Sequence, residues 1–158
     1  MTIAVGDKIP SIKLKYASDK GPADITTDEI FNGKKVVLFA VPGAFTPTCT
    51  AAHLPGFVVN VDAIKAKGVD TVACMAVNDA FVMGAWGKSQ NAEHILMLAD
   101  GNAELTRALG LDLDASGFGM GTRSKRFAMI VNNGVVELLN VDGVALEKSS
   151  AEAILAAL

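Results

Sequence analysis

The chain has 158 residues, of which 51% are hydrophobic and 20% charged, a composition that favours one folded domain over residues 1–158 and argues against disorder. A formal net charge of −3 gives no electrostatic footprint for nucleic acid, and no apolar run approaches the roughly 18–20 residues that cross a bilayer. The first residues lack the pattern of a secretion signal, and two cysteines are too few for a disulfide framework, so we expect a cytoplasmic protein with reduced thiols.

The predicted elements alternate between helices and short apolar strands. The predicted strands cover Lys35–Val41, Thr71–Val77, Ile95–Ala99, Phe127–Val131 and Val135–Val141, and an Asn-Asn-Gly turn joins the last two. The predicted helices cover Thr27–Phe31, Pro47 to about Lys67, Asp79 to about Ser89, Asn102–Leu109 and Ser149–Leu158. Pro55 should break or kink the second helix, and Ser150 is the N-cap of the last. This order predicts an α/β fold with a mixed central β-sheet flanked by helices, for which a thioredoxin-like arrangement fits.

Cys49 lies where the first of these buried strands gives way to a helix. A Pro-Gly turn ends the strand, Thr46 has the character of an N-cap, and Pro47 suits the first helical position. Cys49 then occupies the third position, where free N–H groups and the helix dipole favour an anion, and the thiolate is the reactive form of cysteine. This placement favours a nucleophile over a small buried hydrophobe, which is the ordinary role of an isolated cysteine.

The surrounding residues resemble a known signature. Pro42-x-x-x-Thr46-x-x-Cys49 is similar to the peroxidatic motif of peroxiredoxins, and the longer run from Val41 to Thr50, followed by His53-Leu-Pro-Gly-Phe57, resembles the type II (peroxiredoxin-five-like) subfamily. Further matches are Val77-Asn-Asp-Ala-Phe-Val82, Trp86-Gly87 and Lys125-Arg126-Phe127, so the resemblance covers nearly the whole chain.

The resemblance implies a thiol-dependent peroxidase that reduces hydrogen peroxide and alkyl hydroperoxides. By this likeness Cys49 attacks the peroxide and becomes a sulfenic acid, Thr46 hydrogen-bonds the peroxide, Pro42 shields the site, and Arg126 steadies the thiolate. The backbone near Thr48 adds N–H donors. No prosthetic cofactor or metal is implied, only an external thiol reductant.

Two of these residues have ordinary alternatives. Arg126 could be a solvated charge in the run Arg123-Ser-Lys-Arg126, of which Arg123 and Lys125 are expected at the surface. His53, four residues after Cys49 on the same helical face, could support the thiolate or hold a neighbour in place, or be a surface or satisfied structural histidine.

The second cysteine, Cys74, falls within a predicted central strand, which favours a buried inert thiol over a resolving cysteine, because a disulfide there would need backbone movement. Some type II peroxiredoxins carry a resolving cysteine near the C-terminus, but the segment from Val141 to Ser150 has none. The resemblance therefore implies a one-cysteine cycle with glutaredoxin and glutathione, or thioredoxin, as the reductant.

Other classes of site are disfavoured. Cys49, His53, Cys74 and His94 lack the paired spacing of zinc ligands, the glycines from 117 to 121 do not form G-x-G-x-x-G, and no C-x-x-C motif is present. The competing hypothesis is a redox-sensing or chaperone-like interaction protein switched by oxidation of Cys49.

The family likeness also implies a homodimer. Trp86 and the loop phenylalanines Phe45, Phe81 and Phe118 are candidate contacts. The three phenylalanines could instead form an apolar mouth for organic peroxides or pack in the core.

Overall fold

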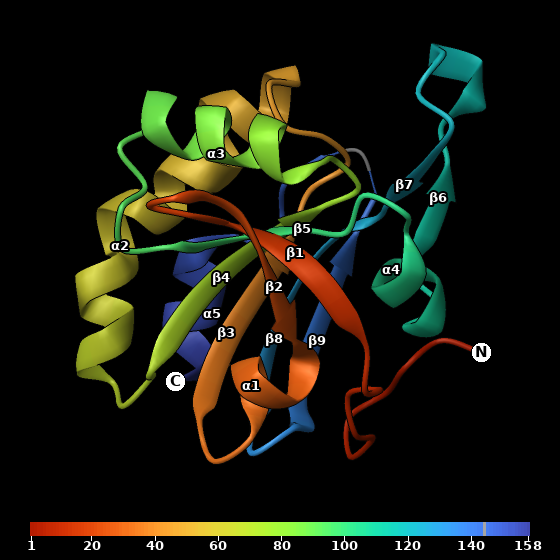
Figure 1. Cartoon of the computed structure of the whole chain (residues 1–158). Coiled ribbons are helices and arrows are strands. Elements are labelled where there is room, and N and C mark those ends of the chain that lie inside the picture. Colours follow the sequence, from red (N-terminus) through yellow and green to blue (C-terminus); the bar gives the residue numbers. More distant parts are fainter. Residues whose placement is uncertain (144) are drawn as a thin grey trace.

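The computed structural model describes residues 1–143 and 145–158 and has a seven-stranded mixed sheet at its centre (Figure 1). The elements are β1 (Lys13–Ser18), β2 (Gly21–Thr26), α1 (Thr27–Phe31), β3 (Lys35–Ala40), the π-helical turn η1 (Cys49–His53), α2 (Leu54–Ala66), β4 (Thr71–Ala76), α3 (Ala80–Ser89), β5 (Leu96–Ala99), α4 (Glu104–Ala108), β6 (Asp112–Asp114), the 3₁₀ turn η2 (Ser116–Phe118), β7 (Thr122–Ser124), β8 (Arg126–Asn132), β9 (Val135–Asp142) and α5 (Ala151–Ala157).

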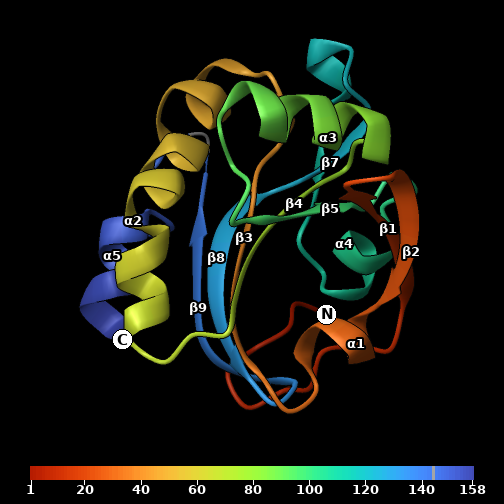
Figure 2. The ribbon, with the colours of Figure 1, turned by 60° about the vertical axis from the view of Figure 1, so that its left-hand side comes forward.

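The sheet has the strand order β2-β1-β5-β4-β3-β8-β9, with β3, β4 and β5 parallel and the outer strands antiparallel. Figure 2 shows α2, α3 and α5 on one face of the sheet and α1 and α4 on the other. Successive side chains of β3 point alternately to the two faces of the sheet. Val37 and Phe39 pack towards α2, whereas Val36 and Leu38 pack towards α1. The predicted α/β fold with a mixed, helix-flanked sheet is therefore confirmed.

The predicted strands and helices recur within a few residues of the expected limits. The Asn-Gly turn joins β8 to β9 with φ of 48° at Asn133 and 80° at Gly134, the left-handed backbone that such hairpin turns need. The β1–β2 and β6–β7 hairpins were not predicted. β2 (GPADIT) is a half-buried edge strand with a proline and an aspartate, and β6 has only three residues, so neither has an apolar pattern.

Pro55 interrupts the long helix as predicted, through a π-helical turn. The Leu54 N–H bonds to the Cys49 carbonyl five residues back, and Pro55, which has no N–H, then stands in the first turn of α2. This turn keeps Cys49 and His53 on one face of the helix.

Within the described residues, no helix is both long enough and apolar enough to cross a membrane.

Candidate active site

The loop after β3 connects this strand to the helical segment that contains Cys49. Its Ala44 N–H bonds to Asn78 Oδ1 (3.0 Å), which fastens the loop to the end of β4. Phe45 has a φ of 63°, a left-handed conformation that costs a bulky residue of order 1–3 kcal/mol. The chain turns sharply there, and Thr46 comes back within hydrogen-bond reach of Gly43.

Cys49 lies in the first helical turn, as predicted. Helical backbone begins at Pro47, and the first helical bond runs from Thr50 N–H to Thr46 O (3.0 Å). Pro47 has no N–H, and the N–H groups of Thr48 and Cys49 precede that bond, so they have no partner within the helix. Cys49 itself is only 1% exposed and packs into the layer between the sheet and α2.

Arg126 holds the Cys49 sulfur. It is the first residue of β8, is 3% exposed, and donates from Nη2 to Cys49 Sγ over 3.2 Å. Its other terminal nitrogen, Nη1, lies 2.8 Å from His53 Nδ1. Arg126 is therefore a buried residue of the site and not a solvated loop charge.

The charge of Arg126 has no carboxylate to balance it within the part of the chain that the structure describes. Both ion pairs found there join Asp24 to Lys13 and Lys15, on the β1–β2 hairpin. A buried cation is costly unless an anion or strong acceptors face it. Cys49 Sγ is the acceptor that faces the guanidinium, at 3.2 Å from Nη2.

His53 is buried and held from both sides of its ring. A guanidinium only donates, so Nδ1 accepts from Arg126, and Nε2–H must donate to the Ser149 carbonyl at 2.9 Å. Burial lowers the pKa of His53 to about 4, the Ser149 bond opposes this, and the charge of Arg126 adds to the lowering. At neutral pH His53 is thus an uncharged acceptor for Arg126, and its ring makes no hydrogen bond to Cys49.

Thr46 uses its hydroxyl differently from the expected N-cap. The hydroxyl donates to the Gly43 carbonyl at 2.6 Å, because the turn at Phe45 brings that carbonyl beneath it. The Thr46 side chain therefore does not accept from the helix backbone as a side-chain N-cap would. Its oxygen keeps a lone pair that can accept a hydrogen bond from a ligand.

The remaining predicted residues of the loop flank this centre. Pro42 is half-buried and its carbonyl accepts from Arg123 Nη1 at 3.3 Å, whereas Thr48 is half-buried and makes no side-chain bond among those described. Arg123 was expected at the surface, but it is half-buried, because Pro42 and the Met120 carbonyl (3.0 Å from Nε) bind it. An added Cβ on Gly43 would lie 2.7 Å from Arg123 Nη1, so the loop is packed tightly around this side chain.

The aromatic residues separate into two groups. Trp86, a candidate dimer contact, is fully buried and donates from Nε1 to Thr50 Oγ1 (3.1 Å), so it is not a surface contact. Phe45, Phe81 and Phe118 are 54%, 75% and 84% exposed, which excludes core packing for all three. Phe45 lies beside Trp86, with ring centroids 6.5 Å apart.

Cys74 is fully buried in β4, on the same face of the sheet as Cys49. Burial raises the pKa of the Cys74 thiol well above its usual range, and the neighbouring Cys49 adds to the rise. A protonated thiol without access to solvent is a poor nucleophile.

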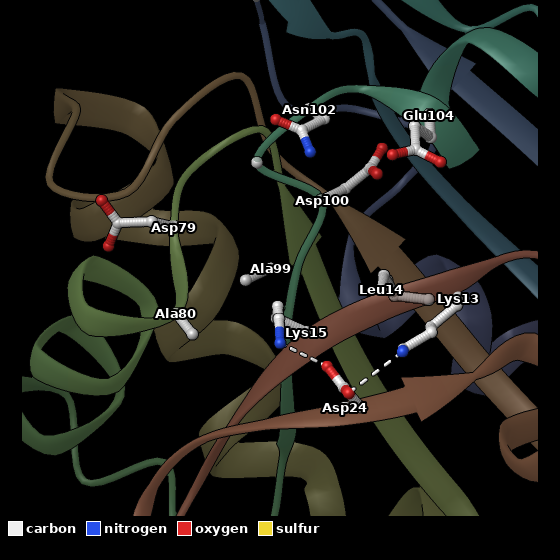
Figure 3. Close-up of a pocket in the computed structure, with 11 residues that line it drawn as sticks. Lys13, Leu14, Lys15, Asp24, Asp79, Ala80, Ala99, Asp100, Asn102 and Glu104 are labelled. Carbon is white, nitrogen blue, oxygen red and sulfur yellow. Dashed lines mark ion pairs between the residues drawn. The ribbon is translucent and has the colours of Figure 1, made fainter.

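A cavity of about 390 Å³ lies between β1 and the segment after β5, and Cys49 is not among its lining residues (Figure 3). Three of its carboxylates have structural tasks. Asp24 faces Lys13 and Lys15, Asp79 caps α3 through Val82 N–H, and Asp100 caps the start of α4. No group of three potential metal-ligating side chains occurs among the described residues.

A cysteine in the first turn of a helix, in contact with a buried arginine of the adjoining mixed sheet, is typical of thioredoxin-like enzymes of thiol redox chemistry. Residues 4–155 match the family model described as Redoxin. The chain is 52% identical to peroxiredoxin-2E-2, chloroplastic, of Oryza sativa subsp. japonica, covering 99% of this chain and 73% of the relative. It is 58% identical to reduced Prx3 of Vibrio vulnificus in complex with H2O2, with a TM-score of 0.95 and 99% of each chain covered.

The chain belongs to the peroxiredoxin family and is a thiol peroxidase. Peroxiredoxin-2D of Arabidopsis thaliana is 45% identical over 99% of this chain and 98% of its own length. These names agree with the type II resemblance of the sequence motif. Enzymes of this family work through cysteine thiols and need no prosthetic group.

The uncharged state of His53 predicts a loss of stability in mild acid. Above pH 6.5 the ring is neutral whether the chain is folded or unfolded, so it has no effect. As the pH falls from 6.5 to 4, the unfolded chain binds a proton that the folded chain refuses, and the free energy of unfolding should fall by about 3 kcal/mol in total. His53→Gln, whose amide has one acceptor and one donor, should flatten this slope.

Urea unfolding of wild type and His53→Gln at several pH values measures the difference. His94→Gln, a change at an exposed histidine, is the matched control and should keep the wild-type slope. Equal slopes for wild type and His53→Gln would contradict the assignment of a neutral His53.

Proposed function

We propose that Cys49 is the peroxidatic nucleophile of a one-cysteine cycle that reduces hydrogen peroxide and alkyl hydroperoxides. The observation that carries this proposal is the contact of 3.2 Å between Arg126 Nη2 and Cys49 Sγ in a buried site. The position of Cys49 at the start of a helix adds the helix dipole and free N–H groups, so several fixed donors surround its sulfur. The relative from Vibrio vulnificus, described in complex with H2O2, supports hydrogen peroxide as one substrate.

In the first step the thiolate sulfur attacks one oxygen of the hydroperoxide. An S–O bond forms, the O–O bond breaks, and its electron pair leaves on the other oxygen, which takes up a proton to become water or an alcohol. Cys49 is then a sulfenic acid. Charge moves from sulfur to the leaving oxygen, so donors already fixed along this line stabilise the transition state.

Three neighbouring residues suit this step. Thr46 has its hydroxyl hydrogen engaged by Gly43, so its oxygen would accept a hydrogen bond from the peroxide O–H. Arg126 Nε is buried and has no hydrogen-bond partner among the described residues, which makes it a donor available to a peroxide oxygen. Pro42 would exclude water from the sulfur, with its carbonyl anchored by Arg123. The backbone N–H at Thr48 would add a donor.

We propose that an external thiol completes the cycle. A first thiol displaces the hydroxyl of the sulfenic acid as water and leaves a mixed disulfide, and a second thiol releases Cys49 as its thiolate. Cys74 is poorly suited to this task, because its thiol is fully buried and protonated. Glutaredoxin with glutathione, or thioredoxin, would supply the thiols, and residues 1–158 would act as one domain without a metal or cofactor.

The test is peroxide consumption in large molar excess over the enzyme, with glutaredoxin and glutathione in one assay and thioredoxin with its reductase in the other. Hydrogen peroxide and an alkyl hydroperoxide are both used. We expect sustained consumption with at least one reductant. Consumption that stops at one peroxide per chain with both reductants would contradict the proposal and favour the redox-sensing alternative.

Peroxiredoxins often form dimers, and we propose that this chain does so through exposed aromatic residues. What supports this proposal is the exposure of Phe45 and Phe81, two large apolar side chains that a partner subunit would cover. A sedimentation mass of one chain in both redox states would exclude this arrangement.

A further inference from the structure

The carboxylate of Asp142 organises the backbone of residues 147–149. Asp142 ends β9, and its two oxygens accept N–H bonds from Glu147 (3.0 Å), Lys148 (3.0 Å) and Ser149 (2.9 Å). The Ser149 hydroxyl donates a fourth bond, of 2.6 Å. Four donors on one buried side chain fix this short segment in a single conformation.

That conformation decides where the Ser149 carbonyl points. The carbonyl accepts from His53 Nε2 at 2.9 Å, and the opposite ring nitrogen, Nδ1, accepts from Arg126 Nη1 at 2.8 Å. Arg126 Nη2 in turn donates to Cys49 Sγ. An unbroken row of hydrogen bonds therefore leads from β9, through the C-terminal segment, to the sulfur.

The donor and acceptor roles in this row of hydrogen bonds depend on one another. An imidazole can accept at Nδ1 only while its proton stays on Nε2, and the Ser149 carbonyl, which can only accept, selects that form. Were the carbonyl displaced, the proton could move to Nδ1, and Nδ1 could no longer accept from Arg126. The guanidinium would then lose one of its two anchors.

Few charged groups lie close enough to His53 to affect which ring nitrogen carries its proton. Arg126 faces it from β8, Asp142 acts on it from β9, and Cys49 lies on its own helix. Phe39 from β3 and Phe57 from α2 pack on its ring and are apolar. Burial raises the pKa of Asp142, but bonds from Ser149, Glu147 and Lys148 outweigh this and lower it to about 2. Asp142 is thus a pure acceptor at neutral pH.

We propose that Asp142 is a positioning residue of the peroxidase reaction: through the Ser149 carbonyl it fixes the Nε2–H tautomer of His53 and thereby the orientation of Arg126 towards Cys49. This inference rests on the proposed function of Cys49. It gives the C-terminal segment a role in activity although that segment contains no cysteine.

The test compares Asp142→Ala and Asp142→Asn with a matched control at Asp100. Asp100 is an equally buried carboxylate that accepts two backbone N–H bonds and a Thr106 hydroxyl, but it caps α4 on the other face of the sheet. Asp100→Asn should therefore loosen its local segment without reaching His53. Asparagine at 142 keeps one acceptor oxygen, so it should act as a partial replacement.

Two readouts are needed. The His53 tautomer is read at neutral pH from the ring nitrogens by two-bond ¹H–¹⁵N correlation NMR, and kcat/KM for hydrogen peroxide is measured alongside. We expect a single Nε2–H form in wild type and in Asp100→Asn. Asp142→Ala should show mixed tautomers and a kcat/KM lower by about 10- to 100-fold, as for small misplacements of catalytic groups, with Asp142→Asn between the two.

Wild-type tautomer and wild-type kcat/KM in Asp142→Asn would overturn the proposal, as would an equal loss of both in Asp100→Asn. If Asp142→Ala does not fold, Asp142→Asn and Asp100→Asn alone decide the matter. The NMR readout needs no turnover, so a failure of the positioning role can be told apart from a failure of the role of Cys49.

Discussion

Cys49→Ser should reduce peroxide consumption to the background rate of the reductant alone. Serine keeps the size and a hydrogen-bond acceptor, but its hydroxyl is not ionised at neutral pH and cannot take up the peroxide oxygen as a sulfenic acid. The measurement is a coupled assay with the reductant that supports wild-type turnover. Residual turnover well above background would contradict the assignment of Cys49.

The matched control for this variant is Cys74→Ala. Cys74→Ser is less suitable, because a hydroxyl without a partner in this apolar layer would cost about 1–3 kcal/mol of stability. Cys74→Ala should retain most of the wild-type turnover if an external thiol resolves the sulfenic acid. A large loss of turnover in a variant that remains folded would instead give Cys74 a resolving role.

Arg126→Met should separate activity from stability. Removing the donor at Cys49 Sγ should lower kcat/KM by about 10²- to 10³-fold, the usual loss for one preorganised donor at a developing charge. The free energy of unfolding should stay equal or rise, because a buried cation with an unpartnered Nε is replaced by an apolar chain.

Arg126→Lys provides the graded control. One ammonium cannot reproduce the two terminal nitrogens that reach Cys49 and His53 separately, so kcat/KM should fall between those of wild type and Arg126→Met. Wild-type kcat/KM in Arg126→Met, or a marked loss of its stability in urea unfolding, would contradict the account of Arg126.

A double-mutant cycle measures the contact between the two side chains. Cys49→Ser leaves the Arg126 cation without an anion and should destabilise the fold, whereas adding Arg126→Met should restore the stability. The coupling expected is about 1–3 kcal/mol, as for a hydrogen bond that involves a charged group. Additive effects would indicate that Arg126 does not sense the charge at Cys49.

Local sequence rules were sufficient to place Cys49. The β3 strand is apolar on both faces, Pro47 starts the helix, and Pro55 interrupts it, and each of these features depends only on neighbouring residues. The position of Cys49 in the first helical turn follows directly. The resemblance to peroxiredoxins then gave Thr46 a role towards the peroxide and singled out Arg126, which composition and spacing could not do.

The support of the site depends on contacts between distant parts of the chain. Arg126 and His53 are 73 residues apart, and His53 and Ser149 are 96 apart, so no local pattern indicates that they meet. The direction of the Thr46 hydroxyl depends on the left-handed backbone at Phe45, an outlier that propensity does not predict. The anchoring of Pro42 by Arg123 likewise needs the β6–β7 hairpin, whose strands are too short to be recognised.

The most direct test of the central claim is to treat the reduced protein with one equivalent of hydrogen peroxide, trap sulfenic acid with a dimedone-type probe, and locate the adduct by peptide mass spectrometry. The account predicts the adduct on Cys49, an unmodified Cys74 and no disulfide between them. An adduct on Cys74, or a Cys49–Cys74 disulfide as the main product, would contradict it.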